Sequence, residues 1–235
     1  RKLPQAVEQR LARDYDARFN ADDRVHSSDE LVELANDADA IIPCHTEKLS
    51  AEVIARLPAS VRAICSFSVG YDHIDLNAAK ARGIFVTNTP EVLSDATAEI
   101  AVLLMLGAAR RVYEGERQIR TGTWADWSAT YQLGIQVTGK RLGILGMGRV
   151  GQIMARRARG FDMQIHYYNR HRLAAEVEQG AVYHQAVEDL LPHCDVLLIQ
   201  CPATPETHHL LNAERIALLP DEAIVVNTAR GAVVD

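Results

Sequence analysis

Three glycines at positions 146, 148 and 151, spaced as Gly-x-Gly-x-x-Gly, are the residues of this chain whose spacing points most directly to chemistry. An apolar run at 142–145 precedes them and a segment rich in alanine and arginine follows, which predicts a strand, a tight turn and a helix. In a dinucleotide-binding crossover, Gly146 would permit the turn, Gly148 would let the backbone approach a pyrophosphate, and Gly151 would let helix and strand pack closely. The phosphates would lie at the helix N-terminus, where N–H groups favour anions. Glycines also serve ordinary turns, so this interpretation depends on its context.

A second predicted strand, at 163–168, supplies that context. Asn169 follows it at the distance where the ribose-reading residue belongs, with Arg170 and Arg172 just beyond. An NAD site usually has Asp or Glu here, whose charge would repel a 2′-phosphate. Asn169 is neutral, and the arginines offer charge-assisted hydrogen bonds to a phosphate. We therefore predict NADP as the cofactor and NAD as the second choice; the alternative is that both arginines are solvated loop charges.

Arg230 is the candidate catalytic residue. It follows an apolar run at 223–227 that predicts a strand, and open α/β sheets bind ligands at the carboxyl ends of their strands. A guanidinium there would clamp a carboxylate with two parallel hydrogen bonds. A surface arginine paired with an acidic neighbour fits the same position equally well.

The loop at 67–75 also follows a predicted strand. Gly70 in this loop would leave backbone N–H groups to hold a carboxylate. From the residues alone, a plain glycine turn in which Asp72 and Asp75 cap the next helix is the favoured interpretation. His73 is expected to be a surface residue rather than a catalyst.

Short helices and apolar strands alternate along the chain. Helices are predicted at 4–19, 28–35 and 50–57, and strands at 38–43, 61–66 and 83–87. The alternation predicts an α/β fold of two Rossmann- or flavodoxin-like domains with parallel sheets. The break at Asn88-Thr-Pro90 divides a substrate domain, 1–90, from a dinucleotide-binding domain, 91–235. Because the chain starts on a helix, at Arg1 rather than at a methionine, we expect that a preceding strand is missing.

The region 93–139 differs in character from its surroundings. Residues 93–111 are almost continuously apolar and predict a helix that must be buried, against the other domain or against a second subunit. The stretch 112–137 carries Trp124, Trp127 and Tyr131 and is long for a loop. We predict a homodimer built through this region; the alternative is a surface excursion whose aromatic side chains pack on their own domain.

Composition excludes several classes of partner. The net charge of −6 gives no electrostatic case for nucleic acid or an anionic membrane, and no apolar run approaches the length of a membrane span. The four cysteines fall singly, with no spacing that suggests a metal site, at Cys44, Cys65, Cys194 and Cys201. We expect buried, reduced thiols in a cytoplasmic protein that holds no metal.

Taken together, five segments resemble the successive signatures of the D-isomer-specific 2-hydroxyacid dehydrogenases, with the glyoxylate/hydroxypyruvate reductase branch nearest. They are Ser68-Val-Gly-Tyr-Asp-His-Ile-Asp75, Asn88-Thr-Pro90 with Asp95-Ala-Thr-Ala-Glu99, Gly146-Met-Gly-Arg-Val-Gly151, Cys201-Pro-Ala-Thr-Pro205 and Val226-Asn-Thr-Ala-Arg-Gly231. The resemblance runs from about residue 38 onward. It implies two Rossmann-like domains with the active site between them, a nicotinamide cofactor, and reduction of a small 2-oxo acid such as glyoxylate or hydroxypyruvate to the D-2-hydroxy acid. It also implies a homodimer built on the cofactor domains.

Residue by residue, the resemblance implies contacts to substrate and nicotinamide from the backbone of Val69 and Gly70, and contacts to the pyrophosphate from Arg149 and Val150. The residues that would line the rest of the cofactor are Thr97, Cys201, Pro202, Thr228 and Ala229. Arg230 would hold the carboxylate of the 2-oxo acid and polarise its carbonyl for hydride transfer.

The family completes this site with a histidine acid and an orienting glutamate after the arginine motif. Neither is present in residues 1–235, and His208 and His209 do not match the position of the acid. We therefore expect the chain to be a fragment that is nearly inactive by itself, because proton donation typically contributes about 10²–10⁴-fold. The alternative is a non-catalytic dinucleotide-sensing or scaffolding protein on the same fold.

Overall fold

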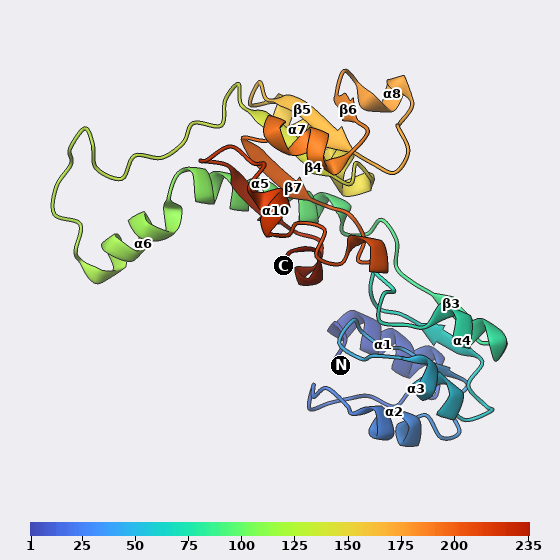
Figure 1. The fold of residues 1–235 in the computed structure, drawn as a ribbon. Coiled ribbons are helices and arrows are strands. Elements are labelled where there is room, and N and C mark those ends of the chain that lie inside the picture. Colours follow the sequence, from blue (N-terminus) through green and yellow to red (C-terminus); the bar gives the residue numbers. More distant parts are fainter. The chain divides into compact units, whose positions relative to one another are not determined.

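The computed structural model describes residues 1–235, which form two compact units, Arg1–Val92 and Leu93–Asp235 (Figure 1). Each unit has its own parallel sheet and its own apolar core. The predicted fold class, α/β with two parallel sheets, is confirmed. The division between the units lies close to the break at Asn88-Thr-Pro90.

The first unit contains a three-stranded sheet in the order β1-β2-β3. Its strands are β1 Ala40–Ile41, β2 Ala63–Cys65 and β3 Phe85–Thr87, and its helices are α1 Gln5–Asp14, α2 Ser28–Leu34, α3 Ala51–Arg56 and α4 Leu76–Ala81. Ile64 on the central strand is fully buried and lies between Ile41 on β1 and Val86 on β3. Apolar residues of α3, including Val53 and Ile54, complete the core on this sheet.

Side-chain caps begin α2, α3 and α4 of this unit, whereas α1 follows Pro4 without one. The Ser50 hydroxyl accepts a hydrogen bond from the Val53 N–H at the start of α3. Helix α2 begins at Ser28, after a capping box formed by Ser27 and Glu30. The prediction that the first helix continues to residue 19 is wrong. Helix α1 ends at Asp14 and Tyr15 is extended. None of the residues of α1 is buried, so little tertiary packing supports a longer helix.

The second unit contains a five-stranded parallel sheet in the order β6-β5-β4-β7-β8. Its strands are β4 Arg141–Leu145, β5 Gln164–Tyr168, β6 Val182–His184, β7 Val196–Ile199 and β8 Ile224–Asn227. Its helices are α5 Ser94–Ala109, α6 Val112–Thr121, α7 Arg149–Arg159, α8 Ala175–Glu178, α9 Val187–Leu190 and α10 Ala213–Ile216, with 3-10 turns η1 Leu191–His193, η2 Pro205–Thr207 and η3 Gly231–Val233. The strand order reverses between β4 and β7, and such a switch point is where doubly wound sheets bind nucleotides.

Helix α5 buries only one of its faces within the chain. Small side chains and one methionine on that face, Ala98, Ala101, Met105 and Ala109, are buried, and the helix packs against α7 and β8. Ile100, Leu103 and Leu104 on the rest of the helix are exposed. The expectation of a helix buried all round therefore does not hold within one chain.

The region after α5 contains a helix, whereas the sequence predicts for residues 112–137 only a stretch that is long for a loop. Arg111 adopts a left-handed conformation that ends α5, and residues 112–121 form the amphipathic helix α6. Within the second unit, α6 and the segment that follows it extend away from the sheet (Figure 1). None of the helices of the chain combines the length and the apolarity that a membrane-spanning segment needs.

Candidate functional site

The glycine turn joins β4 to α7 at the switch point of the five-stranded sheet. Gly146 has a φ of +100°, and a Cβ atom there would lie 2.7 Å from the backbone nitrogen of Cys201. A Cβ atom at Gly151 would lie 2.5 Å from the Gly146 carbonyl oxygen. These approaches require glycine at both positions, because any side chain would separate α7 and the end of β7 from the turn.

Helix α7 begins at Arg149, directly after Gly148, and has no side-chain cap. The first-turn N–H groups of this helix are therefore available to an anion, and the helix dipole favours negative charge there. A Cβ atom at Gly148 would meet nothing within 4 Å, so the space beside the turn is open. Arg149 is exposed and Val150 is half-buried. This arrangement suits a pyrophosphate held by backbone N–H groups.

Asn169 ends β5 beside this turn. Its Oδ1 accepts a hydrogen bond from the Met147 N–H at 2.7 Å, and the Gly146 N–H donates to the Tyr168 carbonyl oxygen at 3.0 Å. The glycine turn is thus held to the end of β5 by both a side chain and a backbone bond. With Oδ1 engaged, the Asn169 amide NH₂ is the group that this side chain can offer to a ribose.

Arg172 has a structural partner that the sequence did not suggest. Its Nε and Nη2 donate to the two carboxylate oxygens of Glu178 at 2.8 and 3.0 Å, and the Tyr167 hydroxyl donates to the same carboxylate. Hydrogen bonds from Arg172 and then Tyr167 lower the pKa of the buried Glu178 carboxyl to about 2. Burial, together with the bond to Glu178, raises the pKa of Tyr167 to about 12. Glu178 lies six positions after Arg172, at the end of α8, and no motif links the two positions.

Arg170 is exposed, and its charge acts on Glu206 in the loop that follows β7. A hydrogen bond from Thr204, and to a smaller extent the positive charge of Arg170, lower the pKa of Glu206 in that loop. Of the two predicted phosphate ligands, Arg170 is the one whose guanidinium forms no hydrogen bond with a carboxylate.

The loops after β7 and β8 carry the other predicted cofactor residues. Cys201 lies against Gly146, whereas Pro202 is exposed, and burial raises the pKa of the Cys201 thiol so that it stays protonated. The side chain of Gln200 donates to the Thr228 hydroxyl, which ties the two loops together. Gln200 was not among the predicted residues, although its place at the carboxyl end of a buried strand is a usable signal.

Asn227 shapes the loop that presents Arg230. Its Oδ1 accepts from the Ala229 N–H at 3.0 Å, and its Nδ2 donates to the Arg230 carbonyl oxygen at 2.8 Å. Arg230 itself is half-buried, and its Nη1 donates to the Ala229 carbonyl oxygen at 3.1 Å. Asn227 is a second residue that the sequence reasoning missed, because its importance lies in two bonds to its own loop.

Thr97 lies in the first turns of α5 and is half-buried. The N-terminal end of this helix is fastened to α7, because Arg157 donates to the carboxylate of Asp95 at 2.8 Å and to its carbonyl oxygen at 2.9 Å. The position of Thr97 is therefore set by the same helix, α7, that begins at the glycine turn.

In the first unit, Val69 and Gly70 follow β2 in a loop braced by hydrogen bonds. The Val69 carbonyl oxygen accepts from Asn88 Nδ2 at 2.8 Å, and the Ser68 hydroxyl donates to the Gly70 carbonyl oxygen. Ser66 Oγ lies 2.8 Å from Ser68 Oγ. The two predicted substrate residues are thus held in a defined backbone conformation at the carboxyl edge of the sheet.

The residues after Gly70 depart in part from expectation. Asp75 caps α4, as predicted, since its Oδ1 accepts from the Ala78 N–H at 2.8 Å. Asp72 instead lies 3.2 Å from His45 Nε2. The expectation that His73 is a surface residue is wrong: it is only 8% exposed, because its ring packs beside His45 and lies against Ser66.

All four cysteines are free. Cys194 is buried, whereas Cys44, Cys65 and Cys201 are half-buried rather than fully enclosed as expected. Burial raises the pKa of the Cys194 thiol to about 12, so it behaves as a small apolar side chain.

Comparisons with known proteins agree with this geometry. The NAD binding domain of the D-isomer specific 2-hydroxyacid dehydrogenases matches residues 102–235. A glycerate dehydrogenase from Hyphomicrobium methylovorum is 44% identical over 235 residues, which cover 99% of this chain and 73% of that protein. A glyoxylate reductase from Pyrococcus furiosus is 40% identical over 240 residues, covering 100% of this chain and 71% of that protein.

A solved structure of a D-isomer specific 2-hydroxyacid dehydrogenase from Polaromonas sp. JS6 66 has a TM-score of 0.93 and 45% identity, and covers 100% of this chain and 74% of that one. The chain belongs to the D-isomer specific 2-hydroxyacid dehydrogenase family. The resemblance drawn from its five motifs is thereby confirmed, and the chain is an NAD(P)-dependent oxidoreductase of this family.

Proposed function

We propose that this protein reduces a small 2-oxo acid, of the glyoxylate or hydroxypyruvate type, to the corresponding D-2-hydroxy acid with hydride from a nicotinamide dinucleotide. The observation that carries the proposal is the glycine turn at the switch point between β4 and β7, in a chain that is 44% identical to a glycerate dehydrogenase and 40% identical to a glyoxylate reductase. The turn supplies the phosphate site of the cofactor, and the two relatives indicate the substrate class.

In this mechanism Arg230 binds the carboxylate of the 2-oxo acid and polarises its carbonyl group. The bound dinucleotide supplies the hydride when it is present. Asn227 contributes by hydrogen-bonding the backbone of Ala229 and Arg230, which fixes the position from which the Arg230 side chain extends. The carbonyl oxygen must also gain a proton, and a guanidinium stays protonated in proteins, so a separate acid has to supply it.

We also propose that the backbone of Val69 and Gly70, in the loop after β2, contacts the substrate. Hydrogen bonds from Asn88 and Ser68 occupy the carbonyl oxygens of Val69 and Gly70. Backbone N–H groups of the same loop are the natural donors to a carboxylate oxygen.

Reduction of different 2-oxo acids by the full-length protein, followed by the absorbance of the reduced nicotinamide, tests the whole proposal.

We expect turnover of glyoxylate and hydroxypyruvate to exceed that of pyruvate and of branched 2-oxo acids. If the protein bound the reduced dinucleotide but no 2-oxo acid oxidised it, the proposed reaction would be contradicted and a dinucleotide-sensing protein would be favoured. Turnover confined to branched acids would keep the reaction and contradict the substrate class.

We propose NADP(H) as the preferred cofactor, on the strength of the residues that follow β5. Asn169 brings no negative charge, Arg170 is exposed beside it, and Arg172 has an Nη1 group that is not used by Glu178. The ion pair with Glu178 holds the Arg172 guanidinium in place, which lowers the entropy that a phosphate contact would cost. NAD(H) remains the second choice.

We also propose a homodimer formed through residues 93–139. The exposed apolar side chains of this region belong to α5, α6 and the segment after them, and include Leu103 at 63%, Tyr113 at 71% and Trp127 at 78% exposure. Patches of this kind on a folded chain usually mark a protein interface. The four free cysteines fit the expected cytoplasmic location.

A further inference from the structure

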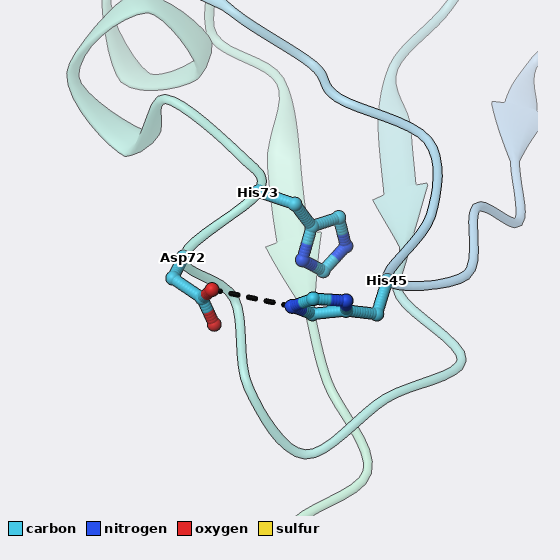
Figure 2. Close-up of side chains that lie close together, drawn as sticks. All are labelled: His45, Asp72 and His73. Carbon is cyan, nitrogen blue, oxygen red and sulfur yellow. Dashed lines mark hydrogen bonds and ion pairs between the residues drawn. The ribbon is translucent and has the colours of Figure 1, made fainter. Parts of the chain in front are cut away.

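Three side chains with metal-binding chemistry meet in the first unit, outside the residues assigned above. His45, Asp72 and His73 each offer one ligand atom, and these atoms lie within 4.8 Å of one another. Figure 2 shows the two imidazole rings and the carboxylate facing a common space, with Asp72 and His45 joined by the 3.2 Å contact. His45 comes from the loop after β1 and the other two residues from the loop after β2.

Backbone bonds hold these two loops together, so the cluster does not depend on mobile side chains alone. The Leu49 N–H donates to the His73 carbonyl oxygen at 2.8 Å, and the Asp75 N–H donates to the Leu49 carbonyl oxygen at 2.9 Å. The Phe67 N–H donates to the Pro43 carbonyl oxygen at 2.8 Å, which anchors the other end of the His45 loop.

Inside that loop, the buried carboxylate of Glu47 accepts from the Cys44 N–H at 2.8 Å and from the Thr46 hydroxyl at 2.8 Å. These bonds fix the residues on both sides of His45. The imidazole of His45 is therefore presented from a short, internally bonded turn whose position relative to Asp72 is set before any ligand arrives.

The orientation of the His73 ring is set by Ser66. The Ser66 hydroxyl lies 3.2 Å from His73 Nε2, so the other ring nitrogen, Nδ1, is directed toward His45 and Asp72, as Figure 2 shows. A metal-binding histidine commonly uses one ring nitrogen as ligand while the other is hydrogen-bonded to an outer group. Ser66 is such an outer group here.

We propose that His45 Nε2, Asp72 Oδ2 and His73 Nδ1 form a binding site for a divalent first-row transition metal ion, with zinc as the preferred ion. Two imidazoles and one carboxylate are donors that suit zinc, and three protein ligands leave a fourth position for water. The side chains of His45 and Asp72 are 49% and 30% exposed, so an ion and a water molecule can reach the site.

Binding replaces the contact between His45 and Asp72 with two bonds to the ion. His45 acts as a ligand through an unprotonated Nε2, with the remaining ring proton on Nδ1. Without a metal, the same two residues form an ordinary hydrogen-bonded pair.

The site is also connected to the loop proposed to bind substrate. Hydrogen bonds run from His73 to Ser66, from Ser66 to Ser68, and from Ser68 to the Gly70 carbonyl oxygen. An ion held by His73 would therefore stiffen the backbone at Gly70. The metal-binding proposal itself does not depend on the proposed function, because it is measured as binding.

The test is titration of the full chain, free of any histidine tag and stripped with EDTA, with Zn²⁺ in a calorimeter and with Co²⁺ by visible absorption. The variants are His45→Gln and Asp72→Asn. A control variant, His208→Gln with His209→Gln, removes an exposed stacked histidine pair of the second unit. A second control, His184→Gln, alters the other histidine cluster.

We expect one Zn²⁺ per chain and the intense absorption of four-coordinate Co²⁺. Both site variants should weaken binding by at least about tenfold, whereas both controls bind as the unmodified chain does. Zn²⁺ should raise the Tm of the unmodified chain and not that of the variants. Asp72→Asn is nearly isosteric, so it keeps the test decisive if His45→Gln fails to fold. Absence of saturable binding, unchanged affinity in the site variants, or loss of binding in a control overturns the proposal.

Discussion

Asn169 Oδ1 accepts the Met147 N–H at 2.7 Å, so the residue that ends β5 also holds the glycine turn that follows β4. The residue predicted to choose between the two dinucleotides therefore also holds the turn that is proposed to bind the phosphates. A substitution at this position changes charge, turn geometry or both, depending on the residue introduced.

Asn169→Asp keeps an acceptor for the Met147 N–H and adds a negative charge. We expect NADPH binding to weaken by about 1–3 kcal/mol, because the carboxylate repels the 2′-phosphate, with NADH binding similar or better. Asn169→Ala removes the acceptor, so both dinucleotides should bind more weakly. Fluorescence titration with each cofactor measures these affinities. Equal losses of both in Asn169→Asp, or tighter binding of NADH by the unmodified protein, would contradict NADP(H) preference.

Arg170→Ala and Arg172→Ala should separate cofactor recognition from stability. Arg170 is exposed and bonds to no carboxylate, so its loss should lower NADPH affinity about tenfold or more without changing Tm. Arg172→Ala leaves the buried Glu178 carboxylate without its guanidinium and should lower Tm by a few degrees. Thermal melts and NADPH titrations of both variants provide the comparison. An unchanged Tm in Arg172→Ala would show that the ion pair carries no stability.

Arg230→Lys should lower kcat/KM for the 2-oxo acid by at least about 100-fold in the full-length protein, because an ammonium group cannot reproduce the two parallel bonds of a guanidinium. Dinucleotide affinity should change little. Steady-state kinetics and cofactor titration of the same preparation measure the two effects. If cofactor binding fell together with activity, Arg230 would have a structural role instead.

The buried His166 makes the stability of the second unit depend on pH. His166, which is 8% exposed, lies 3.0 Å from His184 through their ring nitrogens and stacks on His193. Burial, followed by the charges of His184, His193 and Arg141 and opposed by Asp195, lowers the pKa of His166 to about 4 from 6.5, and burial also lowers the pKa of His184.

Between about pH 4 and pH 6.5, the unfolded chain binds more protons at His166 than the folded chain does. The contribution of His166 to the free energy of unfolding is therefore fully present above about pH 6.5. It is lost as the pH falls toward 4, by up to about 3 kcal/mol. Urea unfolding near neutral pH and near pH 5 measures the loss. His166→Gln should flatten this dependence, and an equally steep loss in that variant would assign it to other groups.

Leu103→Lys should disrupt the proposed dimer, because it introduces a charge on the exposed face of α5. Val182→Lys is the control, since Val182 is an exposed apolar residue on β6, outside the region 93–139. Light scattering after size-exclusion chromatography gives the mass of each. A dimeric Leu103→Lys protein, or an unmodified protein that is monomeric, would contradict the assignment of the interface.

The amino-acid sequence by itself determined those features that depend on local geometry. The turn at Gly146 requires a positive φ, Ser50, Asp75 and Asn212 place a hydrogen-bond acceptor where a helix N-terminus needs one, and the alternation of apolar strands with helices specifies parallel sheets. Each of these signals lies within a few neighbouring residues, so it can be recognised without knowing what the chain packs against.

Only the tertiary structure decided which polar side chains meet. The carboxylate of Glu178 on α8 binds Tyr167 of β5 and Arg172, and His45 lies beside Asp72, because different elements of the fold converge on one place. No periodicity records such distances, since they depend on how strands and loops far apart in the sequence are brought together. The prediction that His73 lies at the surface failed for this reason, because the ring is buried against His45 of another loop and against Ser66.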